Sequence, residues 1–201
     1  MIILSAGHDP LAKGATYNEF NEHDEAVKWV QIIHNAILGY HLYPCEIAPH
    51  SRTSPEQSAG KVLADKIAWV NKQPSAVLAL EVHFNSDTSK RAKGSETLYA
   101  PGSEAGKWAA ELVQEELTGL FPPSRGIKEG WYRQDHPGHV DYAGDVEGDE
   151  KPLAFLTWTK PVALIIEPEF IYNQEAIELR RAPACVALAA ALVHIAGVLT
   201  K

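Results

Sequence analysis

Three apolar stretches of this 201-residue chain each end on a residue that can bind a divalent metal ion or carry a proton. The stretches 1–7, 76–82 and 162–166 are followed, in that order, by His8, His83 and Glu167. In an open sheet of parallel strands, the side chains just beyond the carboxyl ends of the strands meet at one crevice. If the three stretches are parallel strands, the two imidazoles and the carboxylate therefore belong to a single site.

The residue types at this expected site suit hydrolysis assisted by zinc. Zinc takes imidazole nitrogen and carboxylate oxygen, and a catalytic site has three protein ligands and an open position for water. Two His and one acid leave a net positive charge, which lowers the pKa of the water toward about 7 and polarises a carbonyl. A carboxylate beside the metal suits proton transfer from the water to a departing amine. We assign that catalytic role to Glu167 and predict one zinc ion.

The acid that completes the ligand set with His8 and His83 is left open by the spacing. Four acids crowd the start of the first expected helix, with Glu22 as the best candidate: Glu19, Glu22, Asp24 and Glu25. Acids also stabilise the amino end of a helix, which accounts for all four without a metal.

Composition narrows the class of protein. A net charge of −8 argues against a generic nucleic-acid binder and against a surface drawn to anionic lipid. The two cysteines, Cys45 and Cys185, lie in apolar surroundings and are expected to be buried, reduced thiols. The start of the chain lacks the features of a signal peptide, and residues 185–199 fall short of the ~20 apolar residues that span a bilayer. We expect no membrane anchor, no nucleic-acid partner and synthesis in the cytoplasm.

Strand-like and helix-like stretches alternate along the chain. The expected strands are 1–7, 40–47, 76–82, 95–99 and 162–166; the expected helices are 25–38, which Gly39 ends, 54–71, one that Ser103 caps, and a terminal helix over 185–199. This alternation predicts an α/β fold, with one domain over 1–201 and a twisted, mostly parallel β-sheet flanked by helices on both faces.

Two segments break the alternation. Residues 118–125 form a proline-containing stretch that we expect to be a loop, and residues 130–152 show no clear period. A loop as long as the second is more often functional than idle, so we expect a rim or lid over the site. Its two histidines, His136 and His139, are alternative metal ligands, but a flexible loop supplies poor geometry for a metal site.

Six segments, taken in order, resemble the zinc-dependent N-acetylmuramoyl-L-alanine amidases of the amidase-3 type. They cover nearly the whole chain and are residues 7–10 with 14–15 (Gly-His-Asp-Pro, Gly-Ala), 21–22 (Asn-Glu), 83–86 (His-Phe-Asn-Ser), 94–99 (Gly-Ser-Glu-Thr-Leu-Tyr), 125–128 (Arg-Gly-Ile-Lys) and 164–173 (Leu-Ile-Ile-Glu-Pro-Glu-Phe-Ile-Tyr-Asn). The resemblance puts the family's metal ligands on His8, Glu22 and His83 and its catalytic carboxylate on Glu167.

The resemblance also implies a reaction and a setting. The family cleaves the amide between the lactyl group of muramic acid and L-alanine, so bacterial peptidoglycan is the expected partner. A short version of this kind resembles a phage endolysin that reaches the cell wall through a permeabilised membrane, and no separate wall-binding domain is expected. The candidates for contact with substrate are Asn85, Arg125 and Glu169.

The chain departs from the family pattern at two places. Glu81 stands where the family usually has a small hydroxyl residue, and Pro168-Glu169 replaces a small pair after Glu167. Glu169 either adds negative charge near the site or points to solvent.

Two alternative functions remain open from the sequence. One is a zinc amidohydrolase or carboxypeptidase that acts on small acyl amino acids or peptides, because fold and ligands do not fix a substrate. The other is a non-catalytic wall-binding protein that kept the fold.

Overall fold

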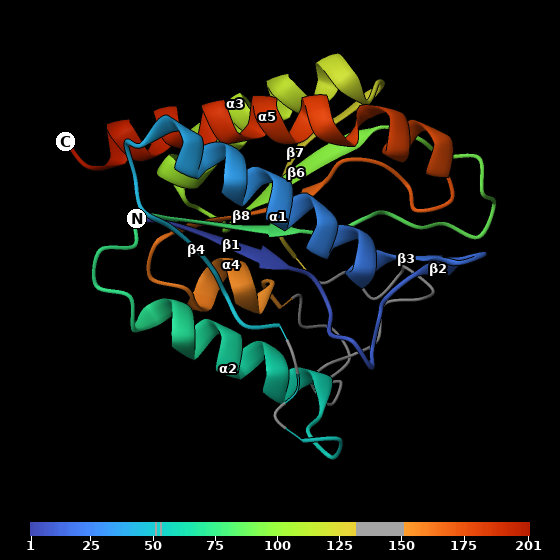
Figure 1. The fold of residues 1–201 in the computed structure, drawn as a ribbon, viewed down its shortest axis with the longest axis horizontal. Helices are drawn as coiled ribbons and strands as arrows, with labels where there is room; N and C mark the ends of the chain where they lie inside the picture. Colours follow the sequence, from blue (N-terminus) through green and yellow to red (C-terminus); the bar gives the residue numbers. More distant parts are fainter. Residues whose placement is uncertain (51, 53, 132–150) are drawn as a thin grey trace.

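A six-stranded sheet runs through the protein, and helices cover both of its faces (Figure 1). The computed structural model describes residues 1–50, 52, 54–131 and 151–201. The strand order is β4-β1-β5-β8-β6-β7, with bounds β1 Ile2–Ala6, β4 Cys45–Ile47, β5 Leu78–Val82, β6 Ser95–Tyr99, β7 Ser124–Glu129 and β8 Val162–Glu167. The first four strands in that order are parallel, whereas β6 runs antiparallel to β8 and β7 runs parallel to β6. The predicted α/β fold with a mostly parallel sheet is confirmed.

Five helices complete the described part of the chain, together with a small hairpin. They are α1 Glu22–Tyr40, α2 Ala59–Asn71, α3 Glu104–Leu120, α4 Ala154–Trp158 and α5 Gln174–Leu199, and the hairpin joins β2 Thr16–Tyr17 to β3 Phe20–Asn21. Helices α1, α3 and α5 cover one face of the sheet, and α2 and α4 cover the other (Figure 1).

The central strands divide their side chains between two apolar cores. Every residue of β1 and β5 is buried, as expected for strands covered on both faces. Alternate residues point to opposite faces. Leu4 and Leu80 therefore join the core under α1, α3 and α5, whereas Ile3 and Ala79 join the core under α2 and α4. Packing on both faces fixes the register of the strands, and the register sets where their ends lie.

Several boundaries differ from the sequence-based predictions. Helix α1 begins at Glu22, three residues early, because the Asn21 side chain accepts a hydrogen bond from the backbone N–H of Asp24. It continues through Gly39 and ends at Tyr40, and the next residue, His41, caps it with a left-handed φ of 55°. Of the expected strand over 40–47, only Cys45–Ile47 form a strand, which is β4.

Two other helix starts were also placed wrongly. Helix α2 begins at Ala59, capped by the side chain of Ser58, so the Ser54-Pro55 signal was misleading. Helix α5 begins at Gln174 and contains Pro183, so it is much longer than the expected 185–199. It is long and apolar enough to cross a membrane by length and composition alone, but nine of its residues are buried in the core.

The two loop predictions have different outcomes. Residues 118–125 contain the end of α3 and the start of β7, so they are not wholly a loop. Most of the expected lid over 130–152 lies outside the described residues, including His136 and His139. At its ends, Trp131 and Pro152 form an antiparallel bridge. Cys45 and Cys185 are buried free thiols, as predicted.

Candidate active site

The carboxyl ends of β1 and β5 place His8 and His83 side by side. The two strands pair in parallel, and the Gly7 N–H donates to the Val82 carbonyl over 2.9 Å. His8 has a left-handed φ of 59°, which turns the chain sharply as it leaves the sheet. The two imidazole centroids lie 5.0 Å apart with an interplanar angle of 67°.

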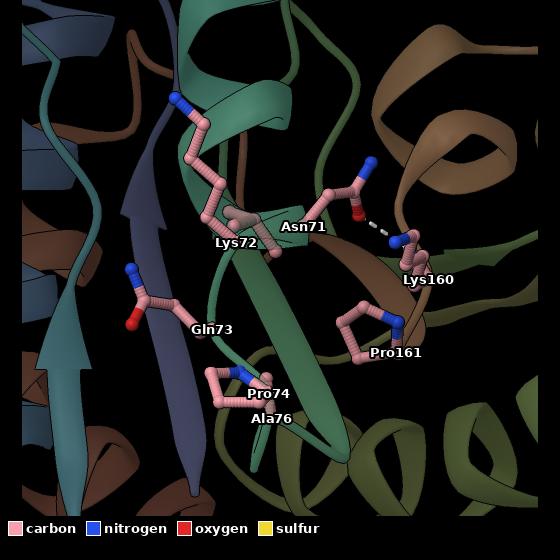
Figure 2. Close-up of a pocket in the computed structure, with 8 residues that line it drawn as sticks. Asn71, Lys72, Gln73, Pro74, Ala76, Lys160 and Pro161 are labelled. Atoms are coloured by element: carbon pink, nitrogen blue, oxygen red, sulfur yellow. Dashed lines mark hydrogen bonds between the residues drawn. The ribbon is translucent and has the colours of Figure 1, made fainter.

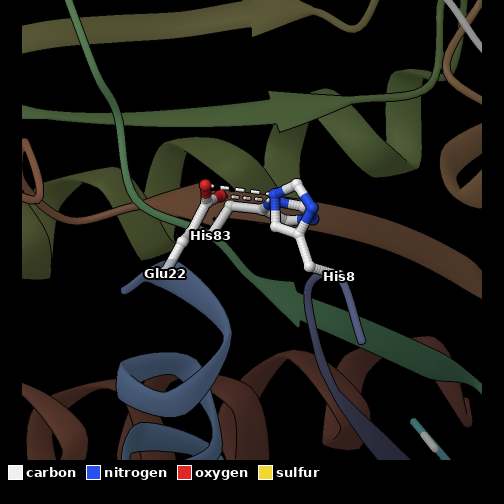
Figure 3. A group of neighbouring side chains, drawn as sticks. All are labelled: His8, Glu22 and His83. Carbon is white, nitrogen blue, oxygen red and sulfur yellow. Dashed lines mark hydrogen bonds and ion pairs between the residues drawn. The ribbon is translucent and has the colours of Figure 1, made fainter. Parts of the chain in front are cut away.

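Glu22 reaches the same point from the first turn of α1. The β2–β3 hairpin returns the chain to the site, where the Glu22 N–H donates to the Ala15 carbonyl over 3.0 Å. Glu22 Oε2 lies 3.0 Å from His8 Nε2, and Glu22 Oε1 lies 2.8 Å from His83 Nδ1 (Figure 3). Among the acids left open by the sequence, Glu22 is the one that the structure brings to both imidazoles.

The other three acids face elsewhere. Glu25 is buried against Arg181, with Nε–Oε1 at 2.5 Å, and Asp24 pairs with Lys13 near the surface. Glu19 is exposed.

Two glycines make room for the three side chains. A Cβ atom at Gly7 would lie 2.5–2.7 Å from ring atoms of His83. A Cβ atom at Gly14 would lie 2.5 Å from Glu22 Oε2 and from the ring of His8, and Gly14 also has a φ of 73° that favours glycine. The backbone therefore approaches the cluster more closely than any other residue type would allow.

The donor set fits a zinc ion. One ligand atom from each of His8, Glu22 and His83 lies within 4.8 Å of the other two. Ligand atoms this close together could all contact one metal ion. Two imidazoles and one carboxylate are also a ligand set that catalytic zinc sites use.

The charges around the cluster favour a cation at its centre. Burial opposes charge on Glu22, yet the two imidazoles hold its pKa well below the usual range. Burial likewise disfavours a charged His83, but the carboxylates of Glu22 and Glu81 raise its pKa to about 10. A bound metal ion would supply the positive charge in place of this proton.

Glu167 lies at the end of β8, next to His83. The pairing of Val82 with Ile166 puts the two residues at neighbouring strand ends, and the His83 N–H donates to the Ile166 carbonyl over 2.8 Å. Burial and the nearby carboxylate of Glu96 raise the pKa of Glu167 to about 8. A carboxyl group with a pKa near neutrality can both accept and donate a proton at physiological pH.

Comparison with known proteins identifies the family of the chain. The family model described as N-acetylmuramoyl-L-alanine amidase matches residues 2–194. The chain belongs to this amidase family. Its members are hydrolases, and the order of the six matching segments in the sequence is explained by this relationship.

Three solved structures share the fold over nearly their whole lengths. The catalytic domain of an endolysin targeting Clostridia difficile is 21% identical, with a TM-score of 0.70 and coverage of 100% of this chain and 97% of that one. An N-acetylmuramoyl-L-alanine amidase from Clostridium difficile 630 is 20% identical, with a TM-score of 0.70 and coverage of 99% and 94%. One from Nostoc punctiforme is 16% identical, with a TM-score of 0.67 and coverage of 100% and 98%. Among curated proteins, no match was found.

A charged cluster that the sequence did not predict borders Glu167 in this amidase domain. Glu96 is the direct cross-strand partner of Glu167 and is 6% exposed. Its carboxylate accepts hydrogen bonds from Asn85 Nδ2 at 2.7 Å, Arg125 Nε at 3.1 Å and Lys128 Nζ. Two of the predicted substrate contacts, Asn85 and Arg125, thus lie at the site edge with Glu96 between them. Arg125 also lies over the Phe170 ring, 5.0 Å from its centroid.

Glu169 does not point to solvent, which was one of the two alternatives that the sequence left open for it. It is 2% exposed, and its Oε1 accepts hydrogen bonds from the backbone N–H groups of Gly94 and Phe170 and from Asn173 Nδ2. These contacts hold the segment after β8 against the start of β6. They favour a structural role, while contact with substrate stays a prediction.

A separate hollow of about 330 Å³ lies near the amino ends of β5 and β8, at the opposite end of these strands from His83 and Glu167 (Figure 2). It lies where α2 ends and β5 and β8 begin, and the Asn71 side chain there accepts a hydrogen bond from the Lys160 N–H over 2.7 Å. Its lining, within residues 70–76 and 160–161, includes no acid and no histidine. It therefore offers none of the imidazole or carboxylate ligands that a catalytic zinc ion takes.

Proposed function

We propose that the protein is a zinc-dependent amidase that cleaves the bond between N-acetylmuramic acid and L-alanine in bacterial peptidoglycan. The observation that carries this proposal is the convergence of His8, Glu22 and His83 from three separate elements, with Glu167 at the neighbouring strand end. Family membership supplies the substrate class, and the donor set supplies the choice of zinc.

In this proposal, the residues divide into metal holders and a proton carrier. His8, Glu22 and His83 would hold one zinc ion, which would lower the pKa of a water molecule and polarise the scissile carbonyl. Glu167 takes a proton from the water as its oxygen bonds to the carbonyl carbon. Glu167 then gives the proton to the nitrogen as the carbon–nitrogen bond breaks. The products are the free lactyl carboxylate and a stem peptide that begins with L-alanine.

The surroundings of Glu167 suit both halves of this cycle. With a pKa of about 8, the carboxyl group binds and releases a proton near neutral pH. Glu96 keeps its own negative charge because Lys128 and Arg125 hold its pKa below the usual range, despite burial. The proton is therefore held on Glu167 rather than on Glu96.

Digestion of purified peptidoglycan tests the reaction. Mass spectrometry is expected to find stem peptides that begin with free L-alanine, lost when a chelator removes the metal and restored when zinc is added. Intact glycan–peptide linkages with zinc present would contradict the proposal. Cleavage of small acyl amino acids but not of peptidoglycan would instead identify a small-molecule amidohydrolase.

We also propose that the enzyme serves as a phage endolysin, made in the cytoplasm and acting after the membrane is permeabilised. The fold that it shares with an endolysin catalytic domain supports this use. Cells producing the wild-type chain should lyse only after a pore-forming agent is added, and cells producing Glu167→Gln should not lyse at all. Lysis of producing cells without permeabilisation would contradict this route.

A further inference from the structure

A buried ion pair lies beside the proposed zinc site and is not part of it. Lys66 of α2 and Glu81 of β5 are each 2% exposed, and Lys66 Nζ lies 2.5 Å from Glu81 Oε1. The free energy that it costs to remove two charges from water can exceed what such a pair regains. A pair in this position therefore calls for an explanation other than stability.

The hydrogen bonds of the pair leave one oxygen of Glu81 for another contact. Glu81 Oε1 accepts hydrogen bonds from both Lys66 Nζ and the Ser5 hydroxyl, the latter over 3.1 Å. Lys66 Nζ also donates to the Ala6 carbonyl over 2.7 Å, which fixes the ammonium group against the end of β1. The other oxygen, Glu81 Oε2, lies 3.7 Å from His83 Nε2.

The two nitrogens of His83 therefore face two different carboxylates. Nδ1 faces Glu22 Oε1 at 2.8 Å, on the side of the zinc site, and Nε2 faces Glu81 Oε2 on the side away from it. Glu81 and His83 are two residues apart, so the pleat directs both side chains toward the same face. Gly7 lies against the His83 ring and restricts its position from another side.

We propose that Glu81, held in place by Lys66, is a positioning residue that directs His83 to bind zinc through Nδ1. A carboxylate beside Nε2 favours the tautomer with its proton there, because a lone pair on that nitrogen would be repelled. The lone pair of the neutral ring then lies on Nδ1, toward Glu22 and His8. The inference rests on the zinc site proposed above and names two residues outside it.

Substitution of Glu81 by glutamine gives a sharp test of this role. The amide oxygen would stay with Lys66 and Ser5, because both donate hydrogen bonds to Oε1. The amide NH₂ would then face His83 Nε2 and favour the opposite tautomer. Outer partners of metal-bound histidines contribute about 10–100-fold to metal affinity, so Glu81→Gln should weaken zinc binding by that factor.

A matched control exists in another ion pair with a buried carboxylate. Glu25 is fully buried, and its ion pairs, with Arg181 and Lys28 between α1 and α5, include none of His8, Glu22 and His83. Glu25→Gln should lower the Tm of the metal-free protein, as Glu81→Gln should, but it should leave zinc affinity unchanged. The control separates a general loss of stability from a change at His83.

The measurement is a zinc titration of the metal-free full chain against a chromophoric chelator, with the visible spectrum of the Co²⁺ form as a second readout. A weaker zinc Kd and an altered Co²⁺ spectrum for Glu81→Gln, with neither change in Glu25→Gln, would support the proposal. Wild-type zinc affinity and an unchanged spectrum in Glu81→Gln would overturn it. If that variant does not fold, the double variant Lys66→Met/Glu81→Met, which buries no unpaired charge, is judged by the same two readouts.

The same titration distinguishes the two proposals. Absence of zinc binding by the wild-type chain would contradict the zinc site itself, and the role of Glu81 with it. Tight zinc binding by both the wild type and Glu81→Gln would contradict the positioning role alone.

Discussion

The two halves of the active-site edge are built in opposite ways. On one side, His8 and His83 follow the carboxyl ends of parallel strands, and Glu22 joins them from a helix start. On the other side, Glu96 and Arg125 lie at the beginnings of β6 and β7, which run the other way. The first half provides neutral and anionic metal donors, whereas the second is a buried carboxylate held by cations. The first group, His8, Glu22 and His83, thus suits holding a metal ion, and we call it the metal half. The second group, Glu96 with Arg125, suits control of the proton on Glu167, and we call it the proton-controlling half.

The largest expected effect comes from breaking the metal half at Glu22. Glu22→Gln removes the charge that faces both imidazoles, so zinc affinity should fall by more than the roughly 10–100-fold that an outer partner contributes. Peptidoglycan cleavage should fall with it. Titration with a chelator and mass-spectrometric product analysis measure both. Zinc affinity equal to that of the wild type would show that another group supplies the third ligand.

A smaller but still large effect is expected from Gly14→Ala. The new Cβ would meet Glu22 Oε2 and the His8 ring at 2.5 Å, in addition to the strain of a φ of 73°. Gly102→Ala is the matched control, because Gly102 has the same φ of 73° and no atom within 4 Å of an added Cβ. Both variants should lose about 1 kcal/mol or more of unfolding free energy through the backbone, but only Gly14→Ala should lose zinc affinity. Equal zinc affinities in the two variants would contradict the close packing around the ligands.

The proton-controlling half is tested by Glu96→Gln. The Glu96 carboxylate helps to raise the pKa of Glu167, so its removal should lower that pKa from about 8. In the pH profile of kcat, the limb that reports Glu167 should therefore move to lower pH. Glu46→Gln, an exposed site on β4, serves as the control and should leave the profile unchanged. A Glu96→Gln profile identical to that of the wild type would show that the two carboxyl groups are not linked.

The smallest effect is expected at Asp24, an acid at the helix start that the structure directs away from the metal ligands. Asp24 pairs with Lys13 near the surface, where ion pairs contribute under about 1 kcal/mol. Asp24→Asn should change the unfolding free energy by no more than that and leave zinc affinity unchanged. A large loss of zinc affinity would move the third ligand from Glu22 to its neighbour.

The metal half was accessible from the sequence because buried parallel strands are nearly continuous apolar runs. Such runs made the ends before His8, His83 and Glu167 visible. The choice of Glu22 needed either the family resemblance or the structure, since helix starts attract acids regardless of function. The observed cap at Asn21 explains the choice physically, because it begins α1 three residues earlier than the apolar spacing indicated.

The proton-controlling half was not predicted, for two physical reasons. The spacing of hydrophobic residues does not reveal the direction of a strand. The sequence therefore could not show that β6 runs antiparallel to β8, which brings Glu96 to Glu167. Strand β7 lies at the sheet edge, and its residues Ser124–Glu129 are exposed or only partly buried, so it lacks the apolar run of a central strand. The Lys66–Glu81 contact joins a helix to a strand and is set by packing alone.

The most direct test of the division between metal holders and proton carrier is Glu167→Gln, with zinc content and hydrolysis measured on the same sample. The account predicts one zinc per chain, as in the wild type, and peptidoglycan hydrolysis lower by about 10²–10⁴-fold, the usual contribution of a general acid–base group. Hydrolysis at the wild-type rate with zinc bound would contradict the assignment of the proton to Glu167. Loss of the zinc itself would place Glu167 among the ligands instead.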